Sequence, residues 1–163
     1  PHMPDSSEFL FFRWFTSAVD ILRLLPRGDG GIAAFMITLP LVERAAIGRL
    51  KLRGEESGKD NANVKTEIGV MLRLTEAYQR SIFWDMFRNG FMHLGMPMEG
   101  KTKWLFSGDY GHLPVFQEIK GTRCICLDPW KFADYILGLY HAEPKLITAS
   151  ESAPFADIFF LES

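Results

Sequence analysis

The 163-residue chain has few cysteines and no excess of positive charge. Its two cysteines, Cys124 and Cys126, form a C-x-C pair without the further ligands of a structural zinc site. We expect both to be buried free thiols in a reducing compartment. The formal net charge of −2 excludes the strongly basic overall surface of many nucleic-acid-binding proteins. Any contact with a nucleic acid therefore has to come from a local patch.

Long apolar segments, a secretion signal and internal repeats are also lacking. The longest uncharged apolar run, residues 30–42, is shorter than the roughly 20 residues that cross a bilayer. The glycine-rich stretch before it lacks the Gly-Lys-Ser/Thr ending of a P-loop. We therefore expect a cytoplasmic protein with no membrane contact. Pro1 and His2 before Met3 resemble the remnant of a cleaved tag, so residues 1–3 are set apart and residues 4–163 form one domain.

Helical periodicity accounts for most of the chain. Apolar residues recur every three or four positions in four segments: Ser7–Leu25, Ile32–Leu52, Asn63–His93 and Pro129–His141. The second segment is apolar on every side in its first half, which predicts the most buried helix. Pro40 lies inside that segment and should kink or divide it.

The period changes between the third and fourth helices. Short strands are predicted at 103–106, 113–119 and 122–127. Lys120-Gly121 has the length and composition of a two-residue hairpin turn. The predicted fold is mainly α: an antiparallel four-helix bundle with a small β-hairpin inserted at about 102–127, before the last helix. A tail, 145–163, should pack its apolar end onto the bundle or a partner.

Three polar residues near the end of the third helix carry chemistry. Arg88 has a planar, permanently charged fork that matches phosphate oxygens. Asn89 follows it, and His93, five residues after Arg88, can give or take a proton near neutral pH. These three side chains form a minimal set for phosphodiester cleavage without a metal or cofactor.

The arrangement resembles the Arg-x(4–6)-His motif of the HEPN superfamily, in which a polar residue typically follows the arginine. That family consists of helical bundles with the motif near the end of the third helix, many of them ribonucleases that act as toxins or defence effectors. The resemblance implies that RNA is cleaved through attack by the 2′-hydroxyl of the RNA itself. In this reaction His93 would move protons, Arg88 would stabilise the transition state and Asn89 would orient the phosphate. It also implies a composite site at a two-fold dimer interface, and an antitoxin or regulatory protein as a further partner.

The helix geometry raises one difficulty for this set. Arg88 and His93 lie about 140° apart around an ideal helix. Either Gly90 loosens the helix between them, or two chains pair so that both residues line one cleft. Phe83, Phe87 and Phe91 form a second apolar stripe, and we expect them or the C-terminal tail to bury such a dimer interface.

Other residues are candidates for supporting roles. Glu43 lies on the buried helix and needs a partner, for which Arg88 or His93 would serve; the alternative is a surface ion pair with neighbouring arginines. Lys101, Lys103 and Trp104 follow the motif and could hold an RNA backbone and stack a base, or could begin a solvated strand.

Two other classes of function stay open. The chain could be a HEPN-like bundle that binds RNA or a nucleotide without cutting it, or a helical protein-interaction module. The net charge of −2 favours these, whereas the Arg88–Asn89–His93 set favours the nuclease.

Overall fold

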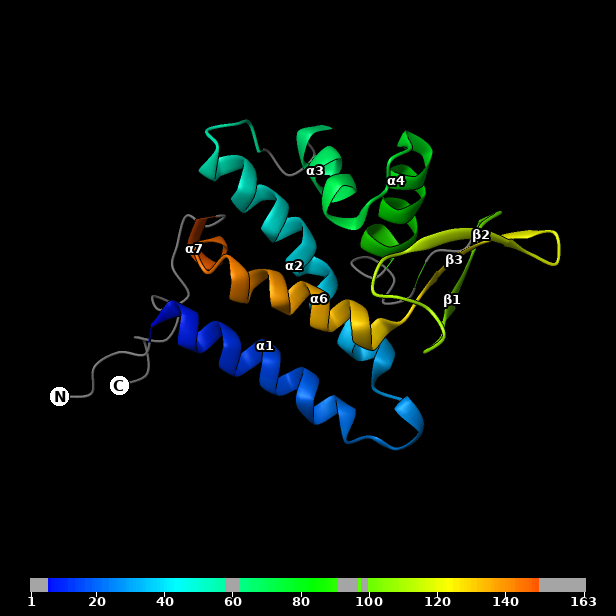
Figure 1. Cartoon of the computed structure of the whole chain (residues 1–163), viewed down its shortest axis with the longest axis horizontal. Coiled ribbons are helices and arrows are strands. Elements are labelled where there is room, and N and C mark those ends of the chain that lie inside the picture. Colours follow the sequence, from blue (N-terminus) through cyan, green and yellow to red (C-terminus); the bar gives the residue numbers. More distant parts are fainter. Residues whose placement is uncertain (1–5, 58–61, 91–96, 98–99, 150–163) are drawn as a thin grey trace.

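A computed structural model describes residues 6–57, 62–90, 97 and 100–149. These residues form a mainly helical protein with a small three-stranded sheet at one end (Figure 1). The predicted fold class is confirmed at this level. The finer expectation of an antiparallel four-helix bundle stays a prediction.

The first helix, α1 (Ser7–Arg23), begins at a residue that caps it. The Oγ of Ser6 accepts a hydrogen bond from the backbone N–H of Phe9 at 3.1 Å, as expected of serine at this position. The helix ends two residues earlier than predicted, and Pro26 then begins the 3₁₀ turn η1 (Pro26–Gly28).

Helix α2 (Gly31–Leu52) lies at the centre of the molecule. It packs against α1, α3, α6 and α7, and Ala34, Phe35 and Ala45 on it are fully buried. The prediction of a central buried helix is therefore confirmed. Pro40 does not divide it, because the helix runs through this residue without a break. Its length and hydropathy would suffice for a membrane span, but 56% of its most apolar window is buried inside the chain, which a core helix explains equally well.

The sequence predicted one continuous third helix, and this prediction is wrong. The structure has α3 (Ala62–Leu72) and α4 (Ala77–Phe83), followed by the π-helical turn η2 (Trp84–Asn89). Arg73 adopts a φ of 54° between the two helices. The break is held by Arg80, whose Nη1 donates to the carbonyl oxygens of Leu74 at 3.0 Å and Thr75 at 2.6 Å.

The sheet contains β1 (Lys103–Phe106), β2 (Val115–Ile119) and β3 (Thr122–Leu127). The predicted hairpin is present: β2 and β3 are antiparallel, and Lys120 and Gly121 between them both have positive φ. Strand β1 pairs in parallel with β3, which makes β3 the central strand. Cys124 and Cys126 are free and buried, as expected.

The last helices lie on α2 and α1. Helix α6 (Pro129–Ala142) starts at Asp128, whose Oδ1 accepts from the N–H groups of Trp130 and Lys131. The short helix α7 (Leu146–Ala149) follows it and packs on α2 and α1. It lies in the predicted tail, whose apolar end falls outside the described residues.

Two phenylalanines of the expected dimer stripe belong instead to the core of the chain. Phe83 and Phe87 are only 2% and 0% exposed. The ring of Phe87 packs against Phe83 at 5.1 Å and against Phe35 of α2 at 5.2 Å. The expectation that these two residues bury an interface is therefore wrong, because their surface is already covered within one chain. Phe91 lies outside the described residues.

Candidate functional site

Arg88 is held from two sides at the end of the π-helical turn. Its Nε donates to Oε2 of Glu43 on α2 at 3.3 Å, and its Nη1 donates to Oδ1 of Asn89 at 3.2 Å. The guanidinium also lies 5.1 Å from the centre of the Trp84 ring, within the range of a cation–π contact. The contact between Glu43 and Arg88, which the sequence suggested, is thus present.

One nitrogen of the Arg88 guanidinium can still donate to a further partner. Nη2 makes no hydrogen bond to any residue of the described part of the chain. The side chains of Arg88 and Glu43 are 25% and 18% exposed. The arginine is therefore fixed in place, and solvent still reaches it.

Asn89 is oriented by a carboxylate one helical turn earlier. Its Nδ2 donates to Oδ1 of Asp85 at 3.1 Å, while the Oγ of Ser81 donates to Oδ2 of the same residue at 3.4 Å. Because the amide nitrogen is engaged by Asp85, the amide oxygen points to the guanidinium of Arg88. A continuous polar chain therefore runs from α4 to Glu43 on α2.

The backbone around this chain is unusual. Trp84–Asn89 forms a π-helical turn, a rare conformation that is frequent at functional sites. The turn contains both Arg88 and Asn89 and ends at Asn89. His93 itself lies outside the described residues.

Glu43 has an unused oxygen. Its Oε1 is buried and makes no hydrogen bond within the described ranges of the chain. A buried carboxylate oxygen without a donor is costly. It lies on the same carboxylate that holds Arg88.

A groove of about 490 Å³ adjoins the polar chain. Asp85 and Met86 of the π-helical turn line one side of it, and Lys101 and Arg123 are also among its lining residues. Lys101 was predicted as an RNA-binding residue. Sequence reasoning did not find Asp85 or Arg123. The i, i+4 spacing of Asp85 and Asn89 was the available signal for the first, whereas nothing in the sequence marked Arg123.

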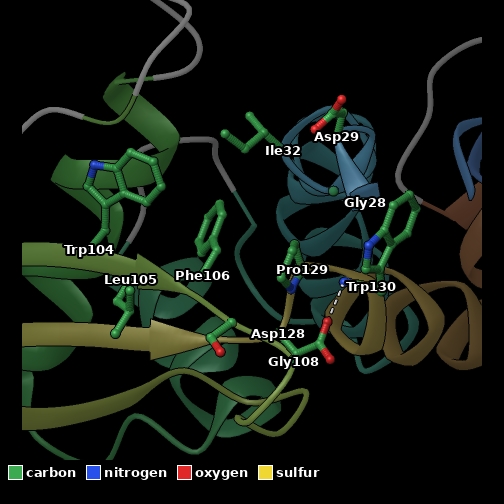
Figure 2. A pocket seen from close by; sticks show the side chains of 12 residues that line it. Gly28, Asp29, Ile32, Trp104, Leu105, Phe106, Gly108, Asp128, Pro129 and Trp130 are labelled. Carbon is green, nitrogen blue, oxygen red and sulfur yellow. Dashed lines mark hydrogen bonds between the residues drawn. The ribbon is translucent and has the colours of Figure 1, made fainter. Parts of the chain in front are cut away.

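The structure does not bring Lys101, Lys103 and Trp104 together in one place. Trp104 lines a different cavity from Lys101, of about 590 Å³, between the sheet and the N-terminal ends of α2 and α6. Figure 2 shows Trp104 and Trp130 on opposite sides of that cavity. Lys103 precedes Trp104 on β1 and so points to the other face of the sheet. Asp29 and Asp128 also line this cavity.

The two histidines within the described ranges, His112 and His141, each pack against an aromatic ring. The ring of His141 stacks on Phe12 at 3.8 Å, and the ring of His112 lies 4.7 Å from Tyr135. Within the same ranges, no three histidine, cysteine, aspartate or glutamate side chains cluster as metal ligands would.

Comparisons with known proteins place the chain in no family. No family model, curated protein or solved structure matches it.

Proposed function

We propose that the protein is a metal-independent endoribonuclease of the HEPN type, with Arg88, Asn89 and His93 as its catalytic residues. The observation that carries the proposal is the fixed position of Arg88. Glu43 and Asn89 hold two of its nitrogens, and its Nη2 stays available. A guanidinium held in this way needs little reorganisation to bind a phosphate, which is the property that electrostatic catalysis requires.

The reaction would be transesterification within the RNA. The 2′-oxygen attacks the adjacent phosphorus, its proton passes to a general base, and the bond to the 5′-oxygen breaks as that oxygen takes up a proton. His93 would move these protons, and Arg88 would stabilise the negative charge on the phosphorus oxygens. The products are a 2′,3′-cyclic phosphate and a 5′-hydroxyl. DNA has no 2′-hydroxyl and would not react.

The proposal includes a homodimer whose two motif helices share one cleft, as the resemblance implies. Because Phe83 and Phe87 are buried in their own chain, the interface would have to use other surfaces. A role as a toxin or defence effector, with an antitoxin or regulatory protein as partner, is part of the same proposal.

The test is incubation of the purified protein with single-stranded RNA in EDTA. We expect cleavage of RNA and none of DNA or of RNA with 2′-O-methyl groups. His93→Ala should abolish cleavage. The matched control is His112→Ala, because His112 is exposed and lies outside the polar chain. Equal activity of these two variants would contradict the role of His93.

A second candidate function is RNA or nucleotide binding without cleavage. It is favoured by the ion pair of Arg88 with Glu43, since the carboxylate offsets part of the positive charge that a phosphate would meet. Retention of labelled RNA by a wild-type protein that cuts nothing in EDTA would support this alternative over the nuclease.

A further inference from the structure

The groove beside the π-helical turn has one wall from the helices and another from the sheet region. Ile82, Asp85 and Met86 come from α4 and the turn, Lys101 and Thr102 precede β1, and Arg123 lies on β3. In Figure 1, α4 lies directly beside β2 and β3. The inserted sheet therefore builds this groove together with the helix that carries Arg88.

The groove carries two cations with no carboxylate attached to them. Lys101 and Arg123 are both exposed, and neither forms a salt bridge with a residue of the described ranges. The carboxylate of Asp85, in contrast, already accepts hydrogen bonds from Asn89 and Ser81. Because neither cation is paired with a carboxylate in the described ranges, both can attract phosphate on a chain whose formal net charge is −2.

An exposed aromatic side chain of α4 lies next to Arg123 of the groove. The guanidinium of Arg123 lies 5.4 Å from the ring centre of Tyr78, and Tyr78 is 49% exposed. Tyr78 also packs at nearly a right angle against Phe116 on β2, with ring centres 6.1 Å apart. Cations next to an exposed aromatic ring are the combination by which proteins bind single-stranded nucleic acids.

We propose that this groove binds a single strand of RNA, with phosphates on Lys101 and Arg123 and a base on Tyr78. Asp85 joins the groove to Arg88 through Asn89, so a strand bound here would lead to the site of cleavage. A duplex would not fit this chemistry, because its bases are stacked on each other and cannot reach Tyr78. The inference rests on the proposed function for its choice of RNA.

The experiment measures binding separately from cleavage. The probe is a fluorescein-labelled, 2′-O-methyl RNA of twelve mixed nucleotides, which cannot be cut through a 2′-hydroxyl, and binding is followed by anisotropy in EDTA at several salt concentrations. Lys101→Ala/Arg123→Ala is the test variant. Its control is Lys145→Ala/Lys120→Ala, which removes the same charge from exposed positions outside the groove.

We expect the test variant to bind the RNA at least about tenfold more weakly at low salt. The slope of log affinity against log salt should fall by about 1.4, since each lost phosphate contact on a single strand removes about 0.7. Tyr78→Ala should weaken binding about fivefold or more, as loss of a base stack does, and Tyr78→Phe should not. Glu118→Gln should tighten binding, because Glu118 is the strand partner of Arg123.

The outcomes separate this inference from the proposed function. If the groove variants bind and cut as the wild type does, the groove proposal is overturned and the nuclease proposal stands. If the wild type binds through the groove and cuts nothing, the nuclease proposal fails and the groove proposal stands. Equal affinity for a duplex of the same sequence would also overturn the single-strand assignment.

Discussion

Glu43 and Arg88, which are 45 positions apart in the chain, form an ion pair between α2 and the π-helical turn, with Oε2 and Nε 3.3 Å apart. The pair fixes the arginine of the motif to the most buried helix of the protein. It also makes Arg88 a structural residue as well as a candidate catalytic one. Experiments on this residue must therefore separate the loss of stability from the loss of chemistry.

The first prediction concerns the stability that this pair provides. Glu43→Gln should lower the free energy of unfolding by about 1–3 kcal/mol, because it leaves a largely buried guanidinium without its carboxylate. Urea denaturation measures the change. Asp20→Asn, at an exposed position of α1, serves as control and should stay within about 0.5 kcal/mol of the wild type. An equal, small effect of both variants would show that the pair contributes nothing.

The second prediction uses two substitutions of Arg88. Arg88→Ala should destabilise the protein by at least as much as Glu43→Gln, since it leaves the buried carboxylate of Glu43 unpaired. The double variant should show a coupling energy of about 0.5 kcal/mol or more. Arg88→Lys keeps the charge and should keep most of the stability. It should still cut RNA about 100-fold or more slowly, because an ammonium cannot replace the planar fork.

Much of the element order could be read from the sequence, for local reasons. Strands at 103–106 and 122–127 were predicted with the bounds that the structure has, because turn residues delimit them. The start of α6 was also predicted correctly, since aspartate followed by proline is a strong helix start. The parallel pairing of β1 with β3 was not foreseen, because no local pattern specifies which strands meet.

The break between α3 and α4 could not be predicted from periodicity. The apolar stripe continues through it, and no glycine or proline marks it. Arg73 has positive φ there, and the turn depends on Arg80, whose side chain holds two carbonyl groups. A capping box between Glu76 and Gln79 was the one local signal. The π-helical turn, in contrast, had no local signal in the sequence.

Residues of the candidate site could be predicted where the pattern of a single helix was enough to identify them. Glu43 was identified because a carboxylate on a buried helix needs a partner, and Arg88 is that partner. The groove around Lys101 and Arg123 was not identified, because it depends on how the sheet packs beside α4. The predicted group of Lys101, Lys103 and Trp104 treated neighbours in sequence as neighbours in space, and alternation along β1 separates the last two.

The third prediction tests the cap of α6. Asp128→Ala should lower the free energy of unfolding by about 1–2 kcal/mol, because two backbone N–H groups of the first turn lose their acceptor. Asp128→Asn should recover most of this loss, since its amide oxygen can accept the same bonds. Thermal or urea denaturation distinguishes the two variants. If the alanine variant is as stable as the wild type, the cap does not stabilise this helix.

The fourth prediction concerns stability at alkaline pH. Burial raises the pKa of Tyr140, whose hydroxyl donates to the carbonyl oxygen of Leu41 at 2.8 Å. The folded protein therefore keeps a proton that the unfolded chain loses above pH about 10, so stability should be full below that pH and fall as pH rises through it. Tyr140→Phe should flatten this decline in urea titrations between pH 8 and pH 11, a range set about the ordinary tyrosine pKa of roughly 10. If the free energy of unfolding of Tyr140→Phe falls with pH as steeply as that of the wild type, groups other than Tyr140 cause the decline.

We propose that Arg88, held by Glu43 and Asn89, acts on the phosphodiester bond of RNA. The most direct test is the chemical identity of the new RNA ends formed in EDTA by the wild type and by Arg88→Lys, with the folding of both confirmed by thermal denaturation. We expect a 2′,3′-cyclic phosphate and a 5′-hydroxyl from the wild type, and almost no product from the folded lysine variant. Equal amounts of product from both proteins, or ends bearing a 3′-hydroxyl and a 5′-phosphate, would contradict it.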